Sequence, residues 1–221
     1  MSLTRPLLHY GLKPLFASWY TYVGAEWAAK TRVSVVGGLY LQARQIRPTV
    51  DIDVVFKSGP GIDRFQIRDN IARLDSRFTI NLEGRCGLTY REKQEDDVVS
   101  IDIIDDTVAM YMPEGMSLDE VVANDAIPLP TDSEAIIMKL IAASDRLKSR
   151  EKKAVNDFDD AMKLFGKMYH EDGVISYKSN MEKQTVKIVF NKFYPTYKAA
   201  KDKQKEFCWT EEEWKTFLKI D

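Results

Sequence analysis

Two acidic residues lie two positions apart in a short apolar segment, Asp51-Ile52-Asp53-Val54. Residues two apart in a β-strand point to the same face, so Asp51 and Asp53 would present their carboxylates together while Ile52 and Val54 enter the core. Adjacent carboxylates repel each other and are costly to bury unless a cation lies between them. A divalent ion such as Mg²⁺, which takes oxygen ligands from a few carboxylates and from substrate phosphates, meets this requirement.

A glycine pair and a third acid complete the set of residues that suggest chemistry. Gly37 and Gly38 end a β-branched segment and precede Asp51 by twelve intervening residues. A strand that ends in glycines and leads into a helix exposes backbone N–H groups to an anion. Downstream, Asp102 lies inside an apolar strand whose isoleucines point the other way. Beside the first strand, Asp102 would complete a cluster of three carboxylates, the set needed to hold two metal ions about 3.5–4 Å apart.

The elements that must position these residues form a mixed α/β domain, expected over residues 1–127. The patterns predict an N-terminal helix over residues 14–30 with Pro14 in its first turn, then a strand that ends at the glycine pair. Further along they predict a helix at 39–46, a strand at 51–56, a helix at 63–75, a hairpin of 78–83 with 87–91 joined through Gly84 and Gly87, and a strand at 98–105.

The rest of the chain is predicted to be an all-helical domain over residues 128–221. The proline- and glycine-punctuated run from Met112 to Pro130 is interpreted as the connection between the two domains. Helices are expected at residues 133–148 and 153–169, followed by two weaker ones at about 178–190 and 196–220.

The order of these motifs resembles a known superfamily. A glycine pair, a dozen residues, an acid–apolar–acid–apolar strand and a later strand with one acid look like the nucleotidyltransferase superfamily with the DNA polymerase β-type fold. More narrowly, VVGG followed by RPTVDIDVVF is similar to the AbiEii-type toxin nucleotidyltransferases. Two motifs of that family follow in the C-terminal part, Lys139-Leu140-Ile141-Ala142 with Arg146, and Asp157-Phe158-Asp159-Asp160. The resemblance covers about residues 33–165 and implies an α+β fold, a mixed-sheet nucleotidyltransferase core followed by a helical domain.

The resemblance also implies a reaction, the Mg²⁺-dependent transfer of a nucleoside monophosphate from an NTP to an acceptor hydroxyl, with release of pyrophosphate. Asp51 and Asp53 would hold two Mg²⁺ ions, and Asp102 would hold the ion beneath the attacking hydroxyl and accept its proton. The nucleotide-binding residues that it implies are Gly37, Gly38, Arg47, Thr49, Lys139, Arg146 and Asp157. The implied acceptor is tRNA, with a protein or small-molecule hydroxyl chemically equivalent, and membership of the toxin family would bring an antitoxin as a partner.

Other interpretations of the same residues stay open. Asn156-Asp157 stands where the toxin family commonly has Arg-Asp. The charged residues Lys139, Arg146, Asp157 and Asp160 would equally form salt bridges between two helices. The chain would also fit a non-catalytic descendant of the fold that binds a nucleotide or a partner protein, although a pseudoenzyme has no need of three clustered acids. A glycosyltransferase with an Asp-x-Asp motif is the third alternative, and it usually needs a larger nucleotide-binding sheet.

Composition limits the remaining function classes. The 221 residues carry 32 basic and 34 acidic side chains, which excludes a strongly basic nucleic-acid binder. Residues 148–221 hold 16 basic and 13 acidic side chains, so an anionic partner is expected at the C-terminal part. Two cysteines, Cys86 and Cys208, and two histidines are too few for a disulfide framework or a zinc site. No stretch is apolar enough to span a membrane, and a cytoplasmic protein is the expectation.

Overall fold

The computed structural model describes residues 5–57, 59, 61–81, 87–93, 98–109, 111–147, 149–171, 173–204 and 208–220, with side chains from residue 11 onward. The chain divides into two compact units, Met1–Pro130 and Thr131–Asp221. No described helix is long and apolar enough to cross a membrane.

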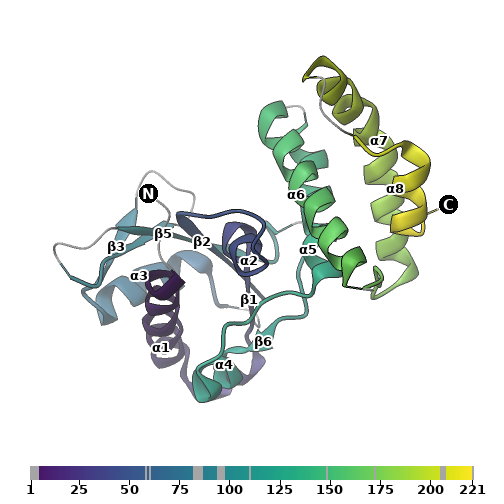
Figure 1. Cartoon of the computed structure of the whole chain (residues 1–221). Helices are drawn as coiled ribbons and strands as arrows, with labels where there is room; N and C mark the ends of the chain where they lie inside the picture. Colours follow the sequence, from purple (N-terminus) through teal and green to yellow (C-terminus); the bar gives the residue numbers. More distant parts are fainter. Residues whose placement is uncertain are drawn as a thin grey trace. The chain divides into compact units, whose positions relative to one another are not determined.

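The first unit is built on a mixed β-sheet with the strand order β3-β4-β5-β2-β1-β6 (Figure 1). Its strands are β1 (Arg32–Val36), β2 (Asp51–Lys57), β3 (Phe78–Asn81), β4 (Gly87–Tyr90), β5 (Val99–Asp105) and β6 (Met116–Ser117). The central pair, β2 and β5, is parallel, and the other neighbours are antiparallel. The helices of this unit are α1 (Arg5–Lys30), α2 (Gly37–Ala43), α3 (Arg64–Leu74) and α4 (Leu118–Asn124). The expected α+β class is confirmed.

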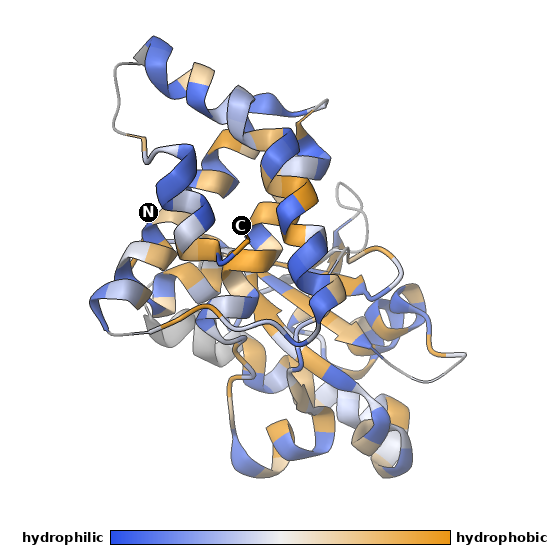
Figure 2. Cartoon of the chain, turned by 90° about the vertical axis from the view of Figure 1, so that its right-hand side faces the viewer, coloured by the Kyte–Doolittle hydropathy of each residue, from blue (hydrophilic) through white to orange (hydrophobic). Residues whose placement is uncertain are grey.

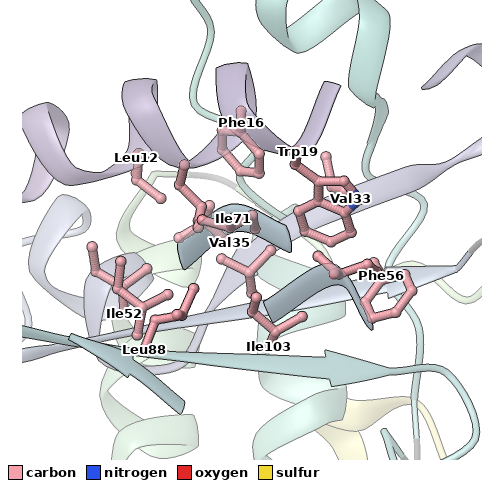
Figure 3. Packing of buried hydrophobic residues seen from close by; sticks show 14 of the residues in the cluster. Leu12, Phe16, Trp19, Val33, Val35, Ile52, Phe56, Ile71, Leu88 and Ile103 are labelled. Carbon is pink, nitrogen blue, oxygen red and sulfur yellow. The ribbon is translucent and has the colours of Figure 1, made fainter. Parts of the chain in front are cut away.

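One face of the sheet carries the hydrophobic core of the first unit. The strand residues alternate, so that Ile52, Val54 and Phe56 of β2 point to the same side and are almost fully buried. Leu12, Phe16 and Trp19 of α1 lie over this side in Figure 3 and pack with the strand residues in one cluster. Fully burying an aliphatic or aromatic side chain contributes about 1.5–3 kcal/mol, so this face fixes which side of β2 is left for the acids.

The second unit consists of α5 (Asp132–Arg146), α6 (Glu151–His170), α7 (Asn180–Gln204) and α8 (Glu211–Leu218). Figure 2 shows these helices striped, with hydrophobic residues along one side and hydrophilic residues along the other. Phe158 of α6 packs against Phe193 and Tyr197 of α7 and against Trp214 of α8, with ring centroids 4.4–4.9 Å apart. This aromatic cluster holds the three helices together.

The run from Met112 to Pro130, interpreted from the sequence as the connection between the domains, has secondary structure of its own. It contains β6 and α4, and both belong to the first unit. Ser117 and Glu120 form a capping box at the start of α4, and Asp125 ends the helix in the left-handed conformation. Such local caps stabilise a two-turn helix despite the surrounding prolines. The division of the chain falls after Pro130, close to the expected boundary after residue 127.

Helix boundaries differ from the expectation at three places. The N-terminal helix begins at Arg5, so Pro14 lies inside it, and the backbone leaves the helical conformation at Gly24. The helix after the glycine pair covers 37–43 instead of 39–46. Near the C-terminus, α7 continues through Pro195 to Gln204, where two helices were expected. An internal proline costs about 3 kcal/mol, and the buried aromatic residues on both sides of Pro195 offset it. The turn of the hairpin, with Gly84, lies outside the described residues.

Candidate active site

The three acids expected to act together lie on neighbouring strands of the sheet. In the parallel pair of β2 and β5, Asp53 and Asp102 are direct partners in the register, and Asp51 is paired with Ser100. Paired residues on adjacent strands point to the same face, about 4.8 Å apart, and Asp51 shares that face because it lies two residues before Asp53. The structure therefore confirms that Asp102 stands beside Asp53 on the same side of the sheet.

The acids occupy an open part of the sheet face opposite the core. Asp51 and Asp102 are exposed, and Asp53 is half-buried. The same face is covered further along, at β1. There Ser34 is fully buried, and its hydroxyl donates a hydrogen bond to the carbonyl oxygen of Pro128 at 3.2 Å. The carboxylates thus stand where the covered part of the face ends, accessible to a ligand from solvent.

The glycine pair lies directly against two of the acids. Val36, at the end of β1, is paired with Asp53, and α2 begins at the next residue, Gly37, which has a φ of 65°. A Cβ on Gly37 would lie 2.1 Å from Oδ2 of Asp53, and a Cβ on Gly38 would lie 2.1 Å from Oγ1 of Thr49 and 3.1 Å from Oδ1 of Asp51. A larger residue at either position would force these side chains to move, so the close approach of Asp53 and Thr49 favours glycine at both positions.

The segment before β2 is tied to both the acids and the helix. The hydroxyl of Thr49 donates a hydrogen bond to Oδ1 of Asp51 at 2.5 Å, and the backbone N–H of Thr49 donates to Oε1 of Gln42 at 3.0 Å. Gln42 did not figure among the expected site residues, although its place four residues after Gly38 puts it on the same side of α2. Arg47 lies in the loop between α2 and β2, is exposed, and donates to the carbonyl oxygen of Pro48 at 3.3 Å.

Gly87 is another residue that sequence reasoning passed over in this role. It is the β4 partner of Asp102, and a Cβ at this position would lie 3.3 Å from Oδ1 of that acid. Nothing in the local sequence signals this contact, because it arises from the antiparallel pairing of β4 with β5.

The remaining expected site residues form a second group, within the helical unit. Nζ of Lys139 on α5 donates to Oδ1 of Asp157 at 2.8 Å and to Oδ2 of Asp160 at 2.9 Å, both on α6. Arg146 donates to the other oxygen of Asp157. Asp157 and Asp160 are each only 4% exposed. The structure thus brings Lys139, Arg146 and Asp157 together as an ion-pair network between two helices, the arrangement that one of the sequence interpretations describes.

The three carboxylates can be compared with the needs of a magnesium ion. Among the described residues, no three acidic, histidine or cysteine side chains stand close enough together, as placed, to hold a metal ion. The donor set nevertheless fits, because carboxylate oxygens are the ligands that Mg²⁺ prefers. Asp51, Asp53 and Asp102 occupy neighbouring positions on one face of the sheet.

Comparisons with known proteins give matches only at the level of structure. No family model and no curated protein matches the sequence. The chain is similar to MenT4, a nucleotidyltransferase toxin from Mycobacterium tuberculosis, with 14% identity and a TM-score of 0.33 over 80% of this chain and 70% of that one. It is similar to the CCA-adding enzyme of Thermotoga maritima in complex with tRNA, with 9% identity and a TM-score of 0.29 over 95% of this chain and 68% of that one.

A third similar structure is a tRNA nucleotidyltransferase in complex with a primer tRNA and an incoming ATP analog. It shares 12% identity, with a TM-score of 0.29 over 89% of this chain and 64% of that one. TM-scores this low carry no conclusion about the activity, substrate or partners of this chain.

Proposed function

We propose that this protein is a metal-dependent nucleotidyltransferase. The observation that supports the proposal is the placement of Asp51, Asp53 and Asp102 on one open sheet face, next to the Gly37–Gly38 turn. Three clustered carboxylates on an exposed face repel each other, and a fold keeps such a cluster where a cation or a proton transfer makes use of it.

In the proposed reaction, an acceptor hydroxyl oxygen forms a bond to the α-phosphorus of an NTP. The bond between that phosphorus and the bridging oxygen breaks, and pyrophosphate leaves with the electron pair. Asp102 takes the proton of the attacking hydroxyl. Asp51 and Asp53 would hold two Mg²⁺ ions, with Asp102 as a further ligand of one. When bound, these ions supply neutralisation of the charge on the phosphates and on the attacking oxygen.

The remaining residues are proposed to hold the nucleotide. The backbone N–H groups of Gly37 and Gly38 would face the phosphates, and Arg47 would add a positive charge nearby. Lys139 and Arg146 are proposed as further cationic contacts, together with Asp157. Since both cations already donate to Asp157, a phosphate that bound them would compete with this carboxylate.

The first acceptor to test is tRNA, because it is the acceptor implied by the sequence resemblance. The purified protein would be incubated with Mg²⁺, each labelled NTP in turn and total tRNA, then with a protein extract in place of tRNA. The expected result is label on a macromolecule with release of pyrophosphate, lost in Asp53→Asn and in Asp102→Asn. Asp202→Asn serves as the control, because it removes an exposed carboxylate of α7 that pairs with Lys198 on the same helix.

The same experiment separates the other interpretations. Tight NTP binding without turnover on any acceptor would indicate a non-catalytic descendant of the fold. Hydrolysis of UDP-sugars without pyrophosphate release from an NTP would indicate a glycosyltransferase. Activity that survives unchanged in Asp53→Asn would contradict the assignment of these acids. To look for an antitoxin partner, the protein would first be expressed to see whether it inhibits growth. A neighbouring open reading frame would then be tested for relief of that inhibition.

A further inference from the structure

Thr49, the threonine before β2, is buried, whereas a side chain that contacts a ligand is expected to be accessible. Thr49 is 5% exposed, although it lies between two exposed residues, Pro48 and Val50. Its Oγ1 is the atom that a Cβ on Gly38 would strike, so the hydroxyl lies packed against the backbone of α2. The side chain thus points into the fold, toward the helix and the first acid of β2.

The hydrogen-bonding capacity of this hydroxyl is used inside the protein. A threonine side chain has one O–H donor, and here that donor is directed at Oδ1 of Asp51. The hydroxyl oxygen lies 3.4 Å from the backbone nitrogen of Asp51, whose N–H donates to it. A phosphate or ribose oxygen that took the same donor would leave Asp51 without its hydrogen-bond partner on this side.

A second residue fixes the position of Thr49. The side-chain amide oxygen of Gln42 accepts from the backbone N–H of Thr49 at 3.0 Å. Gln42 is half-buried and lies on α2, the helix that begins at the glycine pair. A hydrogen-bonded chain therefore runs from α2 through Thr49 to one oxygen of Asp51, and it ties the glycine turn to the carboxylate next to it.

We infer that Thr49 and Gln42 are positioning residues, which hold one oxygen of Asp51 so that the other is presented to a divalent cation. This inference rests on the proposed function and differs from the sequence expectation for Thr49, which would then support a metal ligand and make no contact with the nucleotide. Carboxylates that ligate metals are commonly held by such hydrogen bonds, and loss of the supporting group lowers metal affinity by about 10- to 100-fold.

The test measures metal binding directly, with Mn²⁺ alone as the probe for Mg²⁺. Electron paramagnetic resonance of free Mn²⁺ gives the dissociation constant of the full-length protein. We expect Thr49→Val, which keeps the shape but removes the O–H, to raise this constant by about 10- to 100-fold. Thr49→Ser keeps the hydroxyl and should bind Mn²⁺ close to wild type. The dissociation constant of Gln42→Ala should lie between those of Thr49→Ser and Thr49→Val. Asp51→Asn should bind Mn²⁺ as weakly as Thr49→Val or more weakly.

Three outcomes would overturn the inference. One is Thr49→Val binding Mn²⁺ as tightly as wild type. The second is an equal loss in Thr49→Ser and Thr49→Val, because the loss would then follow any change at this position and not the removal of the hydroxyl. The third is wild-type Mn²⁺ binding that does not depend on Asp51. Urea unfolding of each variant checks that the fold is intact. If Thr49→Val is unstable, the comparison is made between Thr49→Ser, which keeps the hydroxyl, and Gln42→Ala.

The inference and the proposed function fail in different experiments. If the Mn²⁺ affinities follow the expected order while no NTP is turned over on any acceptor, the positioning role stands and nucleotidyl transfer is refuted. The opposite result is also possible: transfer occurs and requires Asp53, and Thr49→Val binds Mn²⁺ normally but has a raised KM for the NTP. Thr49 is then a nucleotide contact, and the positioning role is refuted.

Discussion

The contact between Gly37 and Asp53 gives a quantitative test of the site geometry that does not depend on any assay of activity. Gly37 has a φ of 65°, and an alanine Cβ there would lie 2.1 Å from Oδ2 of Asp53. The left-handed backbone costs an alanine about 1–2 kcal/mol. Moving the Asp53 side chain away from its rotamer costs about 0.5–1.5 kcal/mol more. Gly37→Ala should therefore destabilise the first unit by about 1.5–3.5 kcal/mol in total.

Two comparisons separate the backbone strain from the carboxylate contact. Gly61 has a φ of 92°, and a Cβ added there would meet nothing within 4 Å, so Gly61→Ala should show the backbone strain alone, about 1–2 kcal/mol. In an Asp53→Ala background the close oxygen is gone, and Gly37→Ala should again cost only about 1–2 kcal/mol. The difference between the two backgrounds is the coupling between Gly37 and Asp53, expected to be about 0.5–1.5 kcal/mol.

The measurement has to report on the first unit, because two units need not unfold together. Hydrogen exchange followed by mass spectrometry in a urea series gives the free energy of opening for peptides from β1 and β2. Equal destabilisation by Gly37→Ala in the wild-type and Asp53→Ala backgrounds would refute the reasoning, since the carboxylate would then not lie against the glycine. A Gly61→Ala variant as unstable as Gly37→Ala in the wild-type background would refute it equally.

Further predictions concern the helical unit, a buried tyrosine and the core. Asp157→Ala leaves Lys139 and Arg146 without their shared buried partner and should lower the free energy of unfolding by about 3–5 kcal/mol. Asp202→Ala, in the exposed pair with Lys198, should lower it by less than about 1 kcal/mol. Urea unfolding measures both changes. Burial, followed by the charge of Cys208, raises the pKa of Tyr194 from 10.0 to about 12, so its neutral form should contribute stability that is complete below pH 10 and lost as the pH rises through about 12. Absorbance titration of Tyr194→Phe should show one phenol fewer among those that ionise near pH 12, while burial also keeps the pKa of Tyr177 raised; the loss of a phenol that ionises near pH 10 would contradict this. Trp19→Ala should cost about 3–5 kcal/mol because this side chain is fully buried, while Tyr169→Ala, at a side chain 61% exposed, should change thermal stability by less than about 0.5 kcal/mol.

Much of the site was readable from local sequence, because it depends on short-range geometry. The alternation of Asp51 and Asp53 with Ile52 and Val54 determined that both acids leave the core on one side of β2. The strong alternation over β5 placed Asp102 on the polar side of its own strand in the same way. The helix of Asp132–Arg146 was foreseeable from its periodicity and from the capping box of Thr131 and Glu134.

Other features could not be read locally, because they come from residues far apart in the chain. That β5 lies beside β2, so that Asp102 meets Asp53, was an expectation from family resemblance, and only the sheet pairing decided it. The burial of Thr49, its hydrogen bond to Asp51 and the support from Gln42 depend on how α2 folds back onto the segment before β2. Likewise the ion pair between Lys139 and Asp157 depends on the packing of α5 against α6.

The sequence by itself determined which residues face the same way along each strand and helix, since backbone geometry repeats over two or 3.6 residues. The tertiary structure decided which of these faces meet, and hence why glycine is favoured at the two positions that Asp53 and Thr49 approach. Local periodicity carries no information on such contacts, because close approach is set by the packing of several elements at once.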